Sequence, residues 1–154
     1  MIKQLFCFIF VTLVIIANGS LLAQAEKAAD KYEKDDTWKT AKEIKLEETQ
    51  ERTFTTSKDV DWLKLTITNT GYYLFDAIAS FEPWLGVDCA IELYASDMVL
   101  LEENDNYLEA MNDARLYVLL APGKYYLKVY TLSNNPDIYS KGQNGYSIKF
   151  SNPK

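Results

Sequence analysis

The chain has 154 residues, 48% of them hydrophobic and 25% charged, and its net charge is −6 at pH 7. This length fits one globular domain, since domains of roughly 100 to 150 residues are the commonest size. The acidic balance argues against nucleic acid and anionic lipid as partners, because clusters of Lys and Arg hold both, and the sequence has no such cluster.

Histidine is absent from the sequence, which removes the usual general base and the commonest metal ligand. Serine triads, Cys–His pairs and ordinary zinc sites are therefore excluded. Glycine-rich phosphate loops are missing as well. Paired carboxylates would still permit a glycosidase, but 22 acidic residues always provide some pair, so this signal is unspecific. We therefore expect the protein to have no catalytic activity.

The first 25 residues have the pattern of a cleavable secretory signal peptide. Lys3 supplies a positive charge, residues 5–17 form an apolar run, and Ala23-Gln24-Ala25 is a small-x-small cleavage motif. A membrane anchor needs about 20 apolar residues, and Asn18-Gly19-Ser20 interrupt this run. We expect cleavage after Ala25, an exported protein in the periplasm or the extracellular medium, and no membrane span in the mature chain.

Removal of Lys3 with the leader lowers the net charge to −7 and leaves Cys89 without a cysteine partner. Cys89 alternates with Ile91 and Leu93 along one face of a predicted strand. No basic residue stands beside it in sequence to favour a thiolate. We expect a buried, inert thiol.

Residues 26–40 are polar and charged, and we expect at most a short helix or a tether over residues 26–34. From residue 41 to 152 the pattern changes to short segments rich in Tyr, Leu, Ile, Val, Phe and Thr, several of which alternate strictly. The predicted strands lie near residues 42–46, 51–55, 62–68, 72–79, 89–94, 99–103, 115–120, 125–130 and 146–150. Turn signals such as Ala121-Pro122-Gly123-Lys124 and Asn144-Gly145 separate them. The pattern predicts an all-β sandwich or jelly roll.

Six motifs resemble, in order, the pre-peptidase C-terminal (PPC) domain, over roughly residues 30–151. They are DKYEKDDT at 30–37, Ala41, DVDW at 59–62, ENDN at 103–106, LLAPGKYYLKV at 119–129 and GYSI at 145–148. Family members often have Asn where this chain has Asp35. The resemblance implies an antiparallel β-sandwich of jelly-roll type, usually appended to secreted bacterial proteases, with collagen-binding relatives that bind calcium and matrix protein.

Two acidic groups are candidate metal ligands: Glu33, Asp35 and Asp36 in the N-terminal segment, and Asp59 and Asp61 at a predicted strand start. Calcium takes six to eight oxygen ligands, several of them carboxylates. Spacing alone favours a solvated acidic linker and an ordinary turn aspartate. The resemblance implies that the two groups meet, and with it we expect a calcium site.

The chain has 11 Tyr, 7 Phe and 3 Trp. Tyr126 and Tyr130 share one face of a predicted strand, where they form either an aromatic binding surface or a packed surface under a loop. Trp84 lies in a predicted loop, where its side chain either contacts a ligand or closes the end of the sandwich. Trp62 is expected in the core, and Asp105 is expected in a turn.

These patterns predict a non-catalytic secreted binding module, stabilised by calcium, that recognises an extracellular or envelope protein or polysaccharide. The alternative is a structural or assembly subunit of the cell envelope.

Overall fold

Nine β-strands and one short helix make up the part of the chain that the computed structural model describes, residues 29–82, 85–106 and 112–153. All nine predicted segments contain a strand. In chain order the elements are β1 (Lys42–Glu43), β2 (Glu48–Thr53), β3 (Val60–Ile67), β4 (Gly71–Ala79), β5 (Cys89–Ala95), β6 (Leu100–Asn104), β7 (Ala114–Leu120), β8 (Gly123–Thr131), α1 (Pro136–Ser140) and β9 (Gly145–Ser151).

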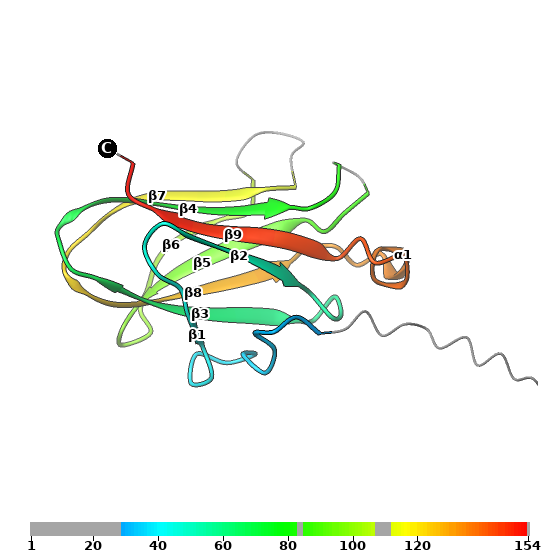
Figure 1. The fold of residues 1–154 in the computed structure, drawn as a ribbon, viewed down its shortest axis with the longest axis horizontal. Coiled ribbons are helices and arrows are strands. Elements are labelled where there is room, and N and C mark those ends of the chain that lie inside the picture. Colours follow the sequence, from blue (N-terminus) through cyan, green and yellow to red (C-terminus); the bar gives the residue numbers. More distant parts are fainter. Residues whose placement is uncertain (1–28, 83–84, 107–111, 154) are drawn as a thin grey trace, which may run out of the picture.

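The strands form two sheets that pack face to face (Figure 1). Sheet A has five strands in the order β1-β3-β8-β5-β6, and sheet B has four in the order β2-β9-β4-β7. All neighbouring strands are antiparallel except the two-residue β1, which pairs parallel with β3. The predicted β-sandwich is confirmed.

Alternation along each strand fills the space between the sheets with apolar side chains. Leu63 and Leu65 of β3 and Leu127 of β8 are buried on the inner face of sheet A. On sheet B the rings of Phe75 and Phe150 stack at 5.2 Å between centroids. Each large side chain buried in this way contributes roughly 1.5 to 3 kcal/mol, which makes this layer the main source of stability.

Cys89 begins β5 with its side chain in this core, fully buried. Burial raises the pKa of the Cys89 thiol far above its usual range, so the thiolate does not form at neutral pH. The expected burial of this thiol is confirmed, and its raised pKa agrees with the expected low reactivity.

Trp62 lies outside the core, and the expectation that it would be buried there was wrong. Its neighbours Asp61 and Leu63 both occupy inward positions of β3. Side chains alternate along a strand, so Trp62 must point to the outer face. There it is half-buried, and its ring lies 5.3 Å from that of Tyr94.

The helix α1 connects β8 to β9 at one end of the sandwich (Figure 1). The side chain of Asn135 caps it by accepting a hydrogen bond from the backbone N of Asp137, and Ile138 is its buried residue. No helix in the described ranges has the length and apolar character that a membrane crossing requires. The predicted signal peptide, residues 1–25, lies outside the described residues.

Candidate functional site

A buried arginine lies where the two predicted acidic groups meet. Arg52 occupies an inward position of β2, and its side chain has no exposed surface. Its Nη1 lies 2.7 Å from Oδ2 of Asp35 and 3.4 Å from Oδ1 of Asp61. Its Nε and Nη2 donate to Oε1 of Gln50, and the ring of Tyr32 lies 4.3 Å from its guanidinium carbon. The Arg52 cluster therefore ties the N-terminal segment to β3.

The other predicted metal ligands have different surroundings. Asp59 is buried and accepts hydrogen bonds from the backbone N and from Oγ1 of Thr55. Asp36 is exposed. Glu33 is half-buried, and its Oε2 accepts a hydrogen bond from the backbone N of Lys34. Of the five predicted ligands, only Asp35 and Asp61 share a partner.

These positions do not fit a calcium ion. The guanidinium of Arg52 is the cation that Asp35 and Asp61 contact, and calcium needs six to eight oxygens at about 2.3 to 2.6 Å. In the parts of the chain that the structure describes, no group of three or more acidic, Cys or His residues could hold a metal. The calcium site expected from the sequence stays untested.

Sequence reasoning missed Arg52, although β2 carries a signal for it. Gln50 and Arg52 alternate on the inner face and run on to the buried Phe54. An arginine in such a position is long enough to reach a buried carboxylate, and buried charges in proteins are paired. The alternation therefore predicts an acidic partner for Arg52.

The Arg52 cluster contains two carboxylates, those of Asp35 and Asp61, but only one guanidinium to pair with them. Burial raises the pKa of Asp61 to about 8, against the opposing effect of Arg52. Burial raises the pKa of Asp35 as well. The hydroxyl of Tyr146 donates to Oδ2 of Asp61, and burial raises the pKa of that hydroxyl. The cluster is thus a closed structural centre that favours retention of one carboxyl proton.

The outer face of sheet A carries the second predicted group, Tyr126 and Tyr130 of β8. The register places Tyr126 between Lys64 of β3 and Tyr94 of β5, and it places Tyr130 between Val60 and Ala90. Both tyrosines are half-buried. The aromatic face, as we name it, comprises Trp38, Trp62, Tyr94, Tyr126 and Tyr130.

Contacts within the aromatic face explain its partial burial. The ring of Trp38 meets that of Tyr126 edge-on at 5.9 Å, which brings the N-terminal segment onto β8. The backbone N of Trp62 donates to the carbonyl of Asp35 at 3.0 Å. The tyrosines therefore both pack against neighbours and keep part of their surface open, so neither of the two alternatives from the sequence holds alone.

An ion pair divides the aromatic face between its two tyrosines. Nζ of Lys128 lies 2.9 Å from Oε2 of Glu92 and 4.4 Å from the ring centroid of Tyr130. Burial acts to raise the pKa of Glu92, but hydrogen bonds from Lys128 and from the hydroxyl of Tyr94 outweigh it and lower that pKa. The pair is fixed in place and separates two hollows.

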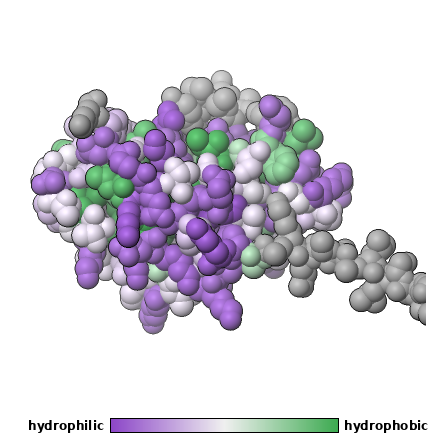
Figure 2. All heavy atoms as spheres, viewed as in Figure 1, coloured by the Kyte–Doolittle hydropathy of each residue, from purple (hydrophilic) through white to green (hydrophobic). Residues whose placement is uncertain are grey.

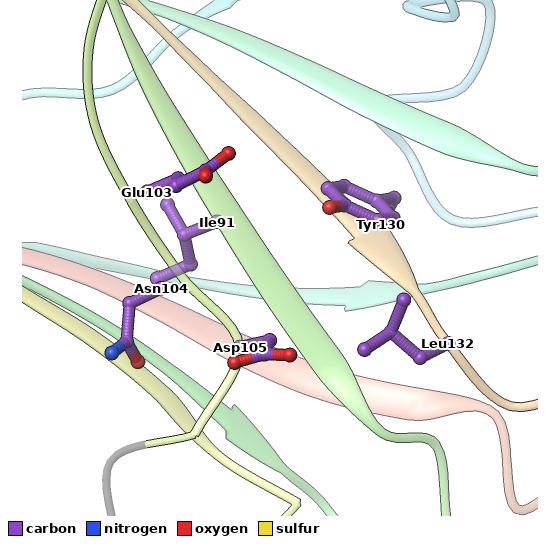
Figure 3. Close-up of a pocket in the computed structure, with 6 residues that line it drawn as sticks. All are labelled: Ile91, Glu103, Asn104, Asp105, Tyr130 and Leu132. Atoms are coloured by element: carbon purple, nitrogen blue, oxygen red, sulfur yellow. The ribbon is translucent and has the colours of Figure 1, made fainter.

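Each predicted tyrosine lines one hollow. The Tyr126 hollow has a volume of about 310 Å³ and includes Lys64, Lys124 and Glu43 in its lining. The Tyr130 hollow has a volume of about 330 Å³ (Figure 3). Its lining residues are Ile91, Glu103, Asn104, Asp105, Tyr130 and Leu132. One face of the sheet therefore presents two aromatic hollows, one mainly basic and the other acidic.

Trp84, the third predicted contact residue, lies outside the described residues, and its role stays a prediction. Asp105, expected in a turn, follows β6 and lines the Tyr130 hollow. Sequence reasoning missed Glu103 as a lining residue, because the pairing of β6 with β5 places it on the outer face and this pairing is not visible in the local pattern.

Comparisons with known proteins bear on the fold. No protein-family model matches the chain, and no curated protein matches it. Among solved structures, the chain is similar to the PPC domain of a collagenase from Bacillus anthracis, with 16% identity and a TM-score of 0.56, over 71% of this chain and 93% of that one.

Two other similar solved structures have TM-scores below 0.5. One is a protein of Sulfurospirillum deleyianum, with 10% identity, a TM-score of 0.44, and coverage of 70% of this chain and 98% of that one. The other is PliG, a periplasmic inhibitor of g-type lysozyme from Aeromonas hydrophila, with 12% identity, a TM-score of 0.37, and coverage of 71% and 96%. The resemblance that the sequence motifs predict is confirmed at the level of the fold, which is similar to that of a PPC domain.

Proposed function

We propose that this protein is a non-catalytic, exported binding module that holds an extracellular or envelope protein or polysaccharide on the outer face of sheet A. The observation that carries the proposal is the position of Tyr126 and Tyr130, each of which lines a hollow on the same face. A ligand that spans both hollows would contact two aromatic rings and charged groups of both signs.

Tyrosine suits such a surface for a physical reason. Its ring offers a large apolar area with few rotatable bonds, and its hydroxyl adds a polar contact. Packing against Trp38 and the ion pair of Lys128 with Glu92 restricts the neighbouring side chains before a ligand arrives. A surface organised in this way loses less conformational entropy on binding.

The absence of catalysis is supported by the chemistry of the chain. The sequence has no histidine, and the Cys89 thiol is buried with a raised pKa. Asp61, whose pKa is raised to about 8, is enclosed with Arg52 instead of facing a hollow. Export is supported by the signal-peptide pattern of residues 1–25.

Co-sedimentation tests the proposal. The exported protein is mixed separately with insoluble type I collagen, peptidoglycan, chitin and cellulose, and the retained fraction is measured. We expect retention on at least one polymer. Exchange of both Tyr126 and Tyr130 for alanine should weaken it about tenfold or more, because buried tyrosine contacts are often worth more than about 1 kcal/mol each.

A matched control uses two other exposed tyrosines, Tyr72 of β4 and Tyr117 of β7, whose rings stack at 5.0 Å on the outer face of sheet B. Their exchange for alanine should leave retention unchanged. Loss of retention in this control variant, with binding intact in the Tyr126 and Tyr130 variant, would refute the proposal.

The alternative function, a structural subunit of the cell envelope, has one observation in its favour. Tyr72, Ile78, Tyr117 and Leu119 leave between 43% and 59% of their surface exposed on the outer face of sheet B. Apolar surface of this kind can meet a partner subunit. Light scattering with chemical cross-linking tests it: a specific oligomer that Leu119→Ser dissolves would favour this function over ligand binding.

A further inference from the structure

The two walls of the Tyr130 hollow differ in chemistry. Glu103 of β6 and Asp105, directly after it, lie on one side of β5, while Tyr130 of β8 and Leu132, just beyond it, lie on the other (Figure 3). The β5 residue paired with Tyr130 is Ala90, whose side chain ends at Cβ. At this register position β5 contributes only a methyl group beside the ring of Tyr130.

The carboxylates of the Tyr130 hollow have no cation of their own. Within the described ranges, neither Glu103 nor Asp105 takes part in an ion pair. Lys128 lies over the ring of Tyr130, but its Nζ is bonded to Glu92. The hollow therefore combines an uncompensated negative wall with a hydrophobic one.

A third carboxylate, that of Asp88, lies in the segment hydrogen-bonded to Leu132, outside the lining of the hollow. The backbone N of Leu132 donates to the carbonyl of Asp88 at 2.8 Å, which holds the two residues together. Oδ1 of Asp88 is buried and has no hydrogen-bond partner among the residues that the structure describes. An unsatisfied buried carboxylate oxygen is costly, and it marks a position that a donor would stabilise.

The raised pKa values of Asp88 and Tyr130 reflect the same excess of negative charge. Burial raises the pKa of Asp88, and the charge of Asp105 raises it further. Burial raises the pKa of Tyr130, and the charges of Glu92, Glu103 and Asp105 add to the effect. Several negative charges therefore act on one small volume, and a bound cation would relieve their repulsion.

We propose that the Tyr130 hollow binds the lysine or arginine side chain of a protein ligand. The apolar stem would lie along Leu132 and the ring of Tyr130, and the cationic head would meet Glu103 and Asp105. A neutral sugar has no charge to match this wall. The inference rests on the proposed function and deepens it by assigning a basic polypeptide to this end of the aromatic face.

NMR titration tests the inference with three blocked tripeptides, in which an arginine, a lysine or a glutamine stands between two glycines. The arginine and lysine peptides should shift the amide signals of Glu103, Asp105 and Leu132 in the exported protein, and the glutamine peptide should not. Exchange of Glu103 and Asp105 together for glutamine and asparagine should weaken binding of the basic peptides roughly fivefold to tenfold.

The matched control is Glu102→Gln on the same strand. Glu102 is exposed, and its pairing with the inward-facing Leu93 places it on the opposite side of β6. Its exchange removes a charge but should leave peptide binding unchanged. Equal shifts with the glutamine peptide, or equal losses in this control and in the Glu103 and Asp105 variant, would overturn the inference.

The result of this NMR titration can be distinguished from the result of the co-sedimentation experiment. If a polymer is retained through Tyr126 and Tyr130 but no basic peptide shifts these amides, the inference fails and the proposed function stands. If basic peptides bind in the hollow but none of the four polymers is retained, the hollow binds basic side chains, and the binding of a polymer across both hollows fails. Tyr126→Ala should leave peptide binding intact, because Tyr126 lines the other hollow.

Discussion

Arg52 is the residue that joins the N-terminal segment to the sandwich. Its guanidinium holds Asp35, outside the sheets, and Asp61, on β3, in one buried centre. Removing one partner of a buried ion pair leaves an uncompensated charge, which typically costs 3 to 5 kcal/mol. Much of the order of residues 30–40 is therefore expected to depend on this side chain.

Replacement of Arg52 by methionine tests this role. The variant should lose about 3 to 5 kcal/mol of the free energy of unfolding in urea, because Asp35 and Asp61 lose their cation. Lys141→Met, which breaks the exposed pair with Asp137, serves as control and should cost less than about 1 kcal/mol. Similar losses in both variants would contradict a structural role for the buried centre.

The effect of calcium on stability tests the same cluster. Because Arg52 already contacts Asp35 and Asp61, we expect the melting temperature of the protein to stay the same in millimolar calcium and in chelator. A rise of several degrees with calcium, reduced by Asp61→Asn, would instead support the calcium site predicted from the sequence. Scanning calorimetry distinguishes the two results.

Asp61 should make stability depend on pH. Its pKa is about 8 in the folded protein and roughly 3.9 in the unfolded chain, so the folded state binds more protons between these values. The free energy of unfolding should therefore fall as the pH rises through this window, and Asp35 should act in the same direction.

Denaturation at a series of pH values measures this slope. Asp61→Asn removes the titrating group, so the difference in stability between the wild type and the variant should change across the window and level off above about pH 8. A constant difference from pH 4 to pH 9 would show that Asp61 does not retain its proton in the folded protein.

At the residue scale the sequence predicts side chains that act within one strand and misses those that act across strands. The shared face of Tyr126 and Tyr130 follows from the alternation of β8 alone. The burial of Cys89 follows in the same way from β5. Arg52 and Asp35 are 17 residues apart, and Glu103 reaches Tyr130 only through the pairing of β5 with both neighbours.

Elements were predictable where the apolar pattern is long and strict. Every strand appears near its predicted residues, because half-buried strands of an antiparallel sandwich must alternate. The parallel pairing of the two-residue β1 was not predictable, since so short a segment has no period. The sequence pattern did not predict the helix α1 for a similar reason, since this helix has five residues, begins with a proline and buries only Ile138.

The stacked pair of Phe75 and Phe150 tests the packing of the central strands of sheet B, β4 and β9. Phe150→Ala should cost about 3 to 5 kcal/mol, the usual loss when a buried phenylalanine is truncated. The neighbouring Lys149→Ala changes an exposed side chain on the other face and should stay within about 0.5 kcal/mol. A loss below 1 kcal/mol for Phe150→Ala in urea denaturation would contradict the described core.

For the whole molecule, the fold and the likeness to a PPC domain were predictable from the order of six motifs, but the grouping of residues from different strands on each outer face was not. Figure 2 shows that the side seen in Figure 1 is mainly hydrophilic, with hydrophobic residues in small separate groups. The two sheets place different aromatic groups on opposite outer faces, with Tyr126 and Tyr130 on one and Tyr72 and Tyr117 on the other. Only the pairing of strands decides which groups share a face and which hollows they line.

The central claim is that ligand binds on the outer face of sheet A, and tryptophan fluorescence tests it most directly. Of the three tryptophans, Trp38 and Trp62 lie on the aromatic face, and Trp84→Phe removes the third. Soluble collagen peptides and oligosaccharides of peptidoglycan, chitin and cellulose serve as probes. The account predicts that the probe from the retained polymer changes the emission of the Trp84→Phe variant, and that additional exchange of Tyr126 and Tyr130 for alanine abolishes this change. An emission change that persists after the tyrosine exchange, or binding without any change in emission, would contradict it.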